Sequence, residues 1–265
     1  MDVRSGFGSP LLKLGYLKAF MDGTLGSRDG APARRVGRRD HEQGRAGTPH
    51  PPSRAGGLPI AVHAIGDLAN REALDAFEAT RADWEPLGLR QRIEHAQLLA
   101  PDDVSRFAEL GITASVQFSH APSDRDLADR IWGGTTSRAV RLPLAPRLRR
   151  RPRRTAPMHR SRSSIHSPGS GRGSLRTLDD RGAWHADQAV TVEEALVATH
   201  RRAGLAGAAT SAGAGKLIPG FLADLVVLDR DPLTCEPEEL PEVRGRRDDA
   251  RRRVDAQPAA LVNFS

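Results

Sequence analysis

The sequence is poor in cysteine, lysine and aromatic residues, and it has no long apolar run. Cys235 is the only cysteine, so the chain cannot form an internal disulfide or a cysteine-rich zinc module. No stretch of about 18 apolar residues occurs, which argues against a membrane-spanning helix. The first 20 residues lack a basic start, an apolar core and a small-residue cleavage site. We therefore expect no secretory signal and a cytoplasmic location.

The net charge of +7 is unevenly distributed over the 265 residues. Three stretches, 29–56, 141–176 and 244–253, hold 23 arginines against five acidic residues, so the rest of the chain is acidic overall. A basic balance is typical of nucleic-acid-binding proteins. However, the chain has only one tyrosine and three tryptophans, few aromatic rings on which bases could stack, and no recognised binding motif. Nucleic-acid binding is therefore an alternative function and not the preferred one.

Two of the basic stretches, 29–56 and 141–176, differ in texture from the rest of the chain. They are rich in Arg, Pro, Gly and Ser, and neither holds a helical or strand period long enough to bury a face. Lysine occurs only three times, which suggests a GC-rich gene, and such DNA read out of frame yields mostly Arg, Pro, Gly, Ala and Ser. We hypothesise that these stretches and the tail after Val243 are frame-shifted translation. A genuine disordered basic linker is the alternative.

The chain between the basic stretches predicts alternating strands and helices. Short runs rich in apolar and β-branched residues indicate strands, and apolar residues at helical spacing separate them. This order predicts a parallel sheet built from βαβ units. The last expected helix has Thr191 as its cap. The expected strands cover 58–64, 89–99, 112–120 and 222–229, and the expected helices cover 68–84, 101–111 and 190–207.

Three successive expected strands each carry a histidine near the carboxyl end. His63 and His95 are separated by about one strand–helix repeat, and His120 ends the third strand. In barrels of parallel strands the active site is built at this end. The sequence therefore places three imidazoles at one rim. The alternative interpretation is that they are ordinary histidines, each satisfied by hydrogen bonds and without a functional role.

Five motifs, taken together, resemble the amidohydrolase superfamily, and specifically its amidohydrolase-3 branch of metal-dependent hydrolases. Each motif alone is weak, but their order and spacing are those of the family. Phe118 stands where the branch carries a proline. The resemblance covers about 11–28, 58–137 and 177–232. The motifs are KAFMDGTLGSR (18–28), IAVHAIGD (60–67), RIEHAQ (92–97), SVQFSHAPSD (115–124) and ADLVVLD (223–229).

The resemblance implies an α/β fold, an incomplete (β/α)8 TIM-type barrel of about strands 4 to 8 with a remnant of a small β-sandwich. The partial barrel is expected over 11–207, interrupted by the basic segments 29–56 and 141–176. The sandwich remnant is expected over 215–235 and an irregular tail over 244–265. Strands 1 to 3 are expected to be absent. Because unpaired strand edges promote aggregation, we expect poor solubility.

The resemblance also implies one or two divalent metal ions, usually zinc. The implied metal ligands are Lys18, His63 and His95, of which the lysine is often carboxylated in the family. Further residues are expected around them. Gln117 and His120 are expected to contact the substrate, Asp67 and Glu94 to orient the ligands, and Asp22 and Gly23 to form a turn that shapes the mouth.

The implied chemistry is hydrolysis of a non-peptide carbon–nitrogen bond in a small amide-like substrate. A metal lowers the pKa of its water to about 7, and the resulting hydroxide attacks the carbonyl. The family also uses a His-x-His pair from strand 1 and an aspartate from strand 8. No His-x-His occurs here, and segment 141–176 contains no acidic residue. We therefore assign no catalytic base and expect the activity of this chain to be impaired. A further alternative is that the chain is a non-catalytic gene remnant.

Overall fold

The computed structural model describes about half of the chain. The basic segments 29–56 and 141–176 lie outside the described residues except for Arg141 and Arg176, and so does the tail after Asp249. The stretches assigned to frame-shifted translation therefore lie outside the described residues, apart from Arg141, Arg176 and residues 244–249. The described residues are 4–8, 12, 14–24, 57–132, 140–141, 176–177, 179–199, 217–219, 221 and 225–249.

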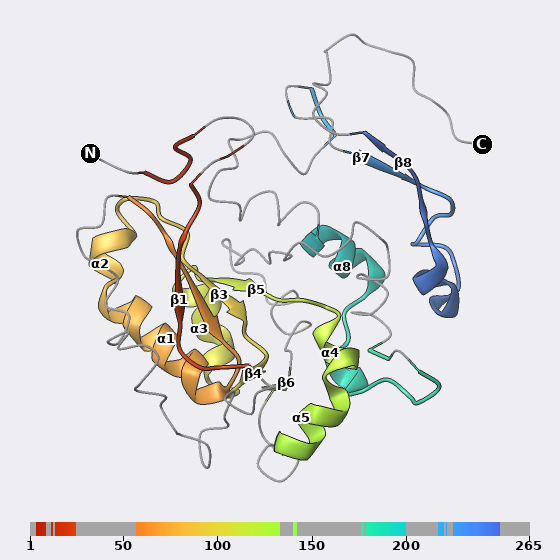
Figure 1. Cartoon of the computed structure of the whole chain (residues 1–265), viewed down its shortest axis with the longest axis horizontal. Helices are drawn as coiled ribbons and strands as arrows, with labels where there is room; N and C mark the ends of the chain where they lie inside the picture. The colour runs from red at the N-terminus through yellow and green to blue at the C-terminus, as the bar shows by residue number, and fades with distance from the viewer. Residues whose placement is uncertain are drawn as a thin grey trace.

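A four-stranded parallel sheet in the order β1-β2-β3-β5 lies at the centre of the described structure (Figure 1). Strand β2 is buried along its whole length, as an apolar strand between two neighbours should be. Because all four strands run the same way, their carboxyl ends meet at one edge, called here the carboxyl edge. The α/β class with a parallel sheet is confirmed. The strands are β1 (Leu17–Phe20), β2 (Ile60–Ala64), β3 (Arg92–His95) and β5 (Thr113–Ser115).

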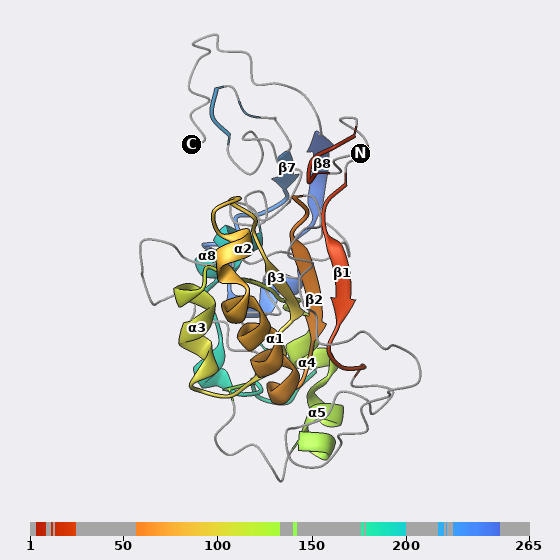
Figure 2. The same cartoon turned by 90° about the vertical axis from the view of Figure 1, so that its left-hand side faces the viewer.

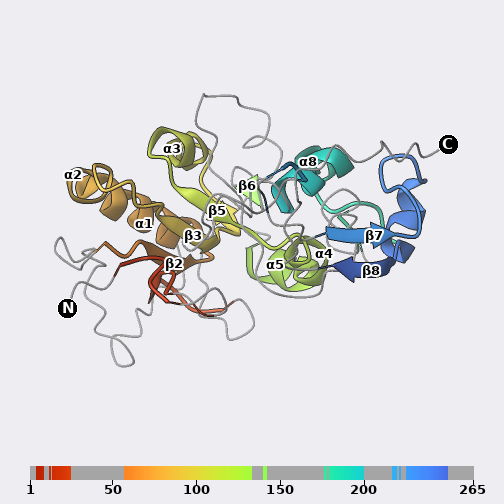
Figure 3. The same cartoon turned by 90° about the horizontal axis from the view of Figure 1, so that it is seen from above.

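Helices α1 (Asp67–Ala79) and α3 (Asp103–Glu109) lie on the same face of this sheet (Figures 2 and 3). The apolar residues of α1 recur at helical spacing, so Leu74 and Phe77 both point into the core and are almost fully buried. Burial of such a side chain contributes about 1.5–3 kcal/mol. Gly111, with a φ of +69°, follows the end of α3 in the left-handed conformation that glycine adopts readily.

The helix expected over 68–84 is divided in two. Helix α1 ends at Ala79, and the short helix α2 (Arg81–Trp84) follows. Thr80 separates them, and its hydroxyl donates a hydrogen bond of 2.7 Å to the Ala76 carbonyl. The side chain of Thr80 thus occupies a carbonyl within the last turn of α1. A Ser or Thr hydroxyl that bonds back in this way often bends a helix.

Two expected strands are shorter than predicted. The strand over 89–99 stops at His95, because His95 and Ala96 have left-handed φ values of 70° and 44° that turn the chain. The two residues Leu98–Leu99 then form β4, which pairs antiparallel with β6 (Val140–Arg141).

The strand expected over 112–120 ends at Ser115, so the prediction that His120 ends a strand is wrong. His120 is the first residue of helix α4 (His120–Ser123), and α5 (Arg125–Trp132) follows. The physical reason is a local turn, in which the His120 N–H donates to the Gln117 carbonyl at 3.1 Å. That hydrogen bond replaces the ladder to a neighbouring strand.

The later part of the chain begins with the short 3-10 helix η1 (Ala186–Gln188) and helix α8 (Val192–Val197). Thr191 caps α8 as predicted. Its hydroxyl accepts the Glu194 N–H at 3.1 Å, and the Glu194 carboxylate accepts the Thr191 N–H at 2.9 Å. Ala195 and Ala198 join the core cluster that contains the sheet residues. The part of the expected helix after Thr199 lies outside the described residues.

An antiparallel ribbon, drawn in blue in Figures 1 and 3, lies apart from the sheet. Strand β7 (Leu225–Leu228) lies within the predicted strand and pairs with β8 (Gly245–Asp249), while the 3-10 helix η3 (Pro237–Glu242) lies between them. Residues 245–249 were predicted to be irregular, and their pairing corrects that part of the prediction. The reason is that GRRDD gains its order from backbone pairing with β7, which composition does not reveal. The sandwich itself stays a prediction.

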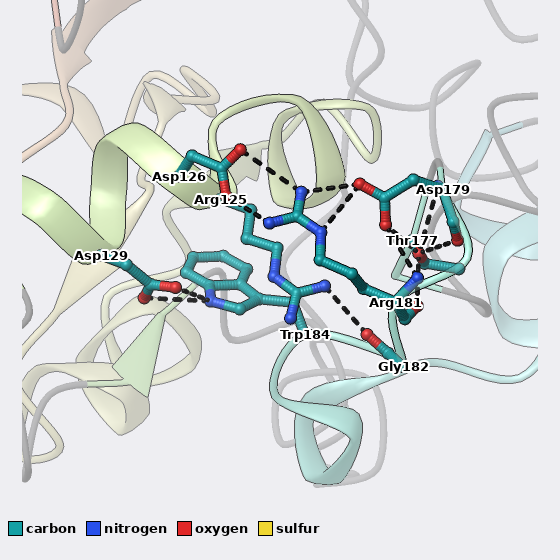
Figure 4. A network of polar contacts seen from close by, with 8 residues as sticks. All are labelled: Arg125, Asp126, Asp129, Thr177, Asp179, Arg181, Gly182 and Trp184. Carbon is teal, nitrogen blue, oxygen red and sulfur yellow. Dashed lines mark hydrogen bonds and ion pairs between the residues drawn. The ribbon is translucent and has the colours of Figure 1, made fainter.

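A network of polar contacts joins α5 to the segment after Arg176 (Figure 4). The Arg181 guanidinium contacts Asp126 at 2.5 Å and Asp179 at 2.6 Å. The indole N–H of the buried Trp184 lies 3.1 Å from both carboxylate oxygens of Asp129. The network therefore holds the residues that follow segment 142–175 in the sequence against helix α5, which precedes that segment. Among the described residues, no helix is long and apolar enough to cross a membrane.

Candidate active site at the carboxyl edge of the sheet

Three imidazole rings lie in a row at the carboxyl edge, and His63, His95 and His120 are called here the histidine row. His63 and His95 lie on adjacent strands, with ring centroids 4.6 Å apart and an interplanar angle of 71°. His120 stacks on His95 with centroids 5.4 Å apart and an angle of 16°. The structure thus brings together the three histidines that the sequence placed at one rim, although the third comes from a helix.

The ring of His63 is held by the loop that follows β1. Its Nε2 lies 3.0 Å from the carbonyl oxygen of Gly23 and 3.6 Å from Oδ1 of Asp22. A carbonyl can only accept, so we assign the hydrogen to Nε2 and the lone pair to Nδ1. Burial lowers the pKa of His63, which keeps the ring neutral near pH 7. A neutral ring whose N–H is engaged by an oxygen is the state in which histidine binds metals.

The ring of His95 is held by Gln117, whose Oε1 lies 2.7 Å from Nδ1. The Gln117 amide nitrogen donates to the Ser115 carbonyl at 3.4 Å, which fixes the amide so that its oxygen faces His95. The hydrogen is therefore on Nδ1, and Nε2 keeps the lone pair. Burial lowers the pKa of His95, while the Gln117 hydrogen bond opposes that shift. The left-handed backbone at His95 is a strained conformation of the kind that clusters at functional sites.

Asp22 fixes the turn between β2 and α1. Its carboxylate accepts the N–H of Ile65 at 3.0 Å and that of Gly66 at 2.8 Å. Burial raises the pKa of Asp22 to about 6, although these two hydrogen bonds oppose the shift. The sequence predicted only a turn at Asp22 and missed its contact with residues 43 and 44 positions later. No local pattern marks a pairing over that distance.

Lys18 lies on the exposed edge strand β1, and its Nζ is 5.1 Å from the ring centroid of Phe20. Partial burial of the ammonium lowers the pKa of Lys18, and the nearby Glu94 carboxylate opposes that shift. A lowered pKa favours the neutral amine, the form in which lysine reacts as a nucleophile. Its assignment as a ligand stays a prediction.

The two residues expected to orient the ligands have other contacts in the structure. Buried Glu94 forms an ion pair with Arg92, with 2.7 Å between Oε1 and Nε, and accepts a hydrogen bond from the Ser115 hydroxyl. Asp67 begins α1, and its Oδ1 accepts the Leu68 N–H at 3.0 Å. These contacts hold the sheet and the helix start. A role of either residue toward the histidines stays a prediction.

His120 differs from the other two histidines because its Nδ1 is buried and has no hydrogen-bond partner in the described part of the chain. Burial lowers the pKa of His120, and the carboxylate of Asp124 opposes the shift. Asp124 itself accepts a hydrogen bond of 2.6 Å from the Gln97 amide nitrogen. Gln97 and Asp124 end two of the motifs, RIEHAQ and SVQFSHAPSD, but no local pattern marks a contact between residues 27 positions apart.

The residues present fit a divalent metal only in part. His63 and His95 supply two neutral imidazoles with one lone pair each, a donor set that zinc and similar metals favour. In the described ranges, however, no three His, Cys, Asp or Glu side chains are arranged to hold a metal ion. A structural zinc site has four ligands, and a catalytic one has three from the protein. His63 and His95, with their rings oriented as in this structure, therefore supply fewer ligands than either kind of zinc site uses.

Known proteins are similar to this chain in sequence and in fold. The model of the amidohydrolase family matches residues 2–255. The protein LONG AFTER FAR-RED 3 of Arabidopsis thaliana is 30% identical over an aligned stretch of 240 residues, gaps included, which covers 86% of this chain and 41% of that protein. The N-substituted formamide deformylase of Arthrobacter pascens is 28% identical over an aligned stretch of 197 residues, gaps included, which covers 71% of this chain and 34% of that protein.

One solved structure agrees with this match. An uncharacterized metal-dependent hydrolase of Pyrococcus furiosus is 28% identical, with a TM-score of 0.63 over 87% of this chain and 47% of that one. The chain therefore spans less than half the length of these three proteins.

Proposed function

Because the chain belongs to the amidohydrolase family, we propose that its site hydrolyses a non-peptide carbon–nitrogen bond in a small amide-like molecule. One observation carries the proposal. His63 and His95 lie side by side at the carboxyl edge, and each has one nitrogen engaged by an oxygen acceptor and the other left with a lone pair. The similar deformylase, which by its name acts on N-substituted formamides, supports an amide-like substrate.

In this proposal His63 and His95 hold a divalent metal ion, for which zinc suits the imidazole donors. Such an ion, when bound, lowers the pKa of a water ligand to about 7 and polarises a substrate carbonyl. The chain's own residues prepare the donors. Gly23 and Gln117 fix the orientation of the two rings, and burial keeps both rings neutral, so no proton has to leave before a metal binds.

We also propose that hydrolysis by this chain is slow. The donors described are two adjacent imidazoles, while the lysine amine lies 5.1 Å from the centroid of the Phe20 ring. A weakly held metal gives low occupancy and therefore few active molecules. The proposed partner is the small substrate alone, in the cytoplasm, with no nucleic acid or membrane.

The test is release of the amine from a panel of N-substituted formamides by the purified chain, with Zn²⁺, Co²⁺ or Mn²⁺ added after treatment with a chelator. We expect turnover that depends on the metal and is lost in His63→Ala and His95→Ala. His185→Gln, a histidine outside the histidine row, is the matched control and should keep the activity. Equal rates with and without metal, or in His63→Ala, would rule out the proposal. Turnover near the usual enzyme value of about 10 per second would refute the slow rate.

A further inference from the structure

Asn70, in the first turn of α1, joins the two chain segments that leave the strands carrying His63 and His95. Its side chain is fully buried, and its Nδ2 donates to the Gly66 carbonyl at 2.8 Å and to the Leu98 carbonyl at 3.1 Å. Gly66 lies three residues after His63, and Leu98 lies three residues after His95. A single amide group therefore links the segment that follows β2 to the segment that follows β3.

The orientation of the Asn70 amide is fixed by its surroundings. The carbonyl oxygens of Ala64 and Ile65 lie 3.3 Å from Nδ2, so four acceptors surround this nitrogen. Oδ1 is buried and has no hydrogen-bond partner in the described part of the chain. Exchange of the two atoms would point an amide oxygen at four carbonyl oxygens, none of which can donate. The nitrogen must therefore face the carbonyls.

Three of the four carbonyls do not depend on the Asn70 side chain for a hydrogen bond, because each also accepts a backbone N–H. These backbone bonds run from Ala96 to Ala64 at 2.9 Å, from Leu98 to Ile65 at 2.8 Å and from Asn70 to Gly66 at 3.0 Å. Loss of the Asn70 amide therefore leaves these carbonyls satisfied, and it also removes the unsatisfied Oδ1. The fold should survive that loss, while the two segments lose a constraint on their relative position.

We propose that Asn70 is a positioning residue, which sets the relative position of the His63 and His95 rings by holding together the segments that follow them. The two rings are in edge-to-face contact, with centroids 4.6 Å apart. The loop after β1 holds one ring and the segment after β5 holds the other, so these ring hydrogen bonds do not join β2 to β3. This inference rests on the proposed function, in which both rings serve one reaction. A misplacement of about 1 Å can cost about 100-fold in rate.

The experiment compares Asn70→Ala with Gln91→Ala in the full chain. Gln91 is the matched control, a second buried amide, whose Oε1 accepts the Ile60 N–H at 2.6 Å at the amino ends of β2 and β3. The signals measured are the ring-proton NMR resonances of His63 and His95, because each ring current displaces the resonances of the neighbouring ring by an amount that depends on their separation. We expect these resonances to move in Asn70→Ala and to stay in Gln91→Ala, although both variants should melt at a lower temperature than wild type.

Asn70→Ser separates the two hydrogen bonds of the amide. A serine hydroxyl in a helix can donate to the carbonyl four residues earlier, which here is that of Gly66. The hydroxyl is one bond shorter than the asparagine amide, so it should not reach the Leu98 carbonyl. We expect a melting temperature closer to wild type, with the histidine resonances displaced as in Asn70→Ala. Unmoved resonances in both Asn70 variants, or equal movement in Gln91→Ala, overturn the positioning role.

Turnover of the N-substituted formamides separates this inference from the proposed function. Asn70→Ala should lower kcat by about 100-fold with little change in KM, whereas Gln91→Ala should keep the wild-type kcat. A wild-type kcat in Asn70→Ala overturns the role of Asn70 in the reaction. Absence of turnover in every protein, wild type included, overturns the proposed hydrolysis, and the NMR comparison still decides whether Asn70 positions the two rings.

Discussion

The carboxylate of Asp22 accepts a 2.8 Å hydrogen bond from the backbone N–H of Gly66, 44 residues away in the sequence. The same carboxylate accepts the N–H of Ile65 and lies 3.6 Å from Nε2 of His63. A single side chain thus links the end of β1 to the turn after β2. The position of the first ring of the histidine row depends on that link, because Gly23, its hydrogen-bond partner, is the next residue.

Asp22→Ala is expected to destabilise the fold. The change leaves the N–H groups of Ile65 and Gly66 without their acceptor, and each unsatisfied buried group costs about 1–3 kcal/mol. We expect a loss of about 2–4 kcal/mol in the free energy of unfolding, measured by denaturant titration. Asp102→Ala, which removes an exposed carboxylate that makes no capping hydrogen bond, is the matched control. Equal losses in the two variants would contradict the role given to Asp22.

Asp22 should also make stability depend on pH. Its pKa is about 6 in the folded chain, raised from 3.8, so the folded state holds the proton more tightly than the unfolded state does. Its contribution to stability is therefore fully present below about pH 4, falls as the pH rises, and is lost above about pH 6, by at most about 3 kcal/mol. Asp22→Asn should lack this slope when unfolding is measured between pH 4 and pH 7. A parallel pH profile for the variant and wild type would count against it.

The network on α5 should gain most of its stability from the tryptophan and little from the exposed ion pairs. Arg181→Ala breaks contacts with Asp126 and Asp179, but exposed pairs contribute about 0–1 kcal/mol. Trp184→Ala removes a buried ring and should cost about 3–5 kcal/mol. Thermal melting of both variants measures the difference. A larger loss from Arg181→Ala than from Trp184→Ala would reverse this ranking.

Thr191→Ala should weaken the start of α8. The variant loses the hydroxyl that accepts the Glu194 N–H, a change that costs about 0.5–2 kcal/mol in other helices. Thr191→Ser keeps a hydroxyl in the same place and should lie within a few tenths of a kcal/mol of wild type. Melting curves of the three proteins decide the matter, and a serine variant as unstable as the alanine variant would show that the cap is unimportant.

The edge strand β1 should promote self-association. It pairs only with β2 in the described sheet, and Leu17 and Phe20 on it are 37% and 61% exposed. A charge on an edge strand opposes edge-to-edge pairing, so Leu17→Lys should lower the light scattering of the purified chain. Leu87→Lys, which places the same charge at an exposed leucine outside the sheet, should have little effect. A sharp cooperative melt of a monomeric wild-type chain would contradict the expectation of poor solubility.

Much of the central sheet could be predicted because its signals are local. The run IAVHA is mostly apolar and contains β-branched residues, so it indicates a buried strand without reference to the rest of the chain. Thr191 and Glu194 form a helix cap from residues only three positions apart. The positions of His63 and His95 at the carboxyl edge followed from the same periodicity and were found there. In contrast, the ends of the strands at His95 and Ser115 depend on turns whose backbone angles the sequence does not state.

The sequence by itself determined the strand–helix order, the family and two neighbouring imidazoles, because side-chain periodicity and motif spacing lie within the chain. Only the tertiary structure decided that His120 begins a helix and stacks on His95, that Asp22 holds the turn at Gly66, and that strand β8 pairs with β7. The physical reason is that these contacts join residues far apart in sequence, or depend on backbone angles set by packing. Their free energies exist only when the elements meet in the folded chain.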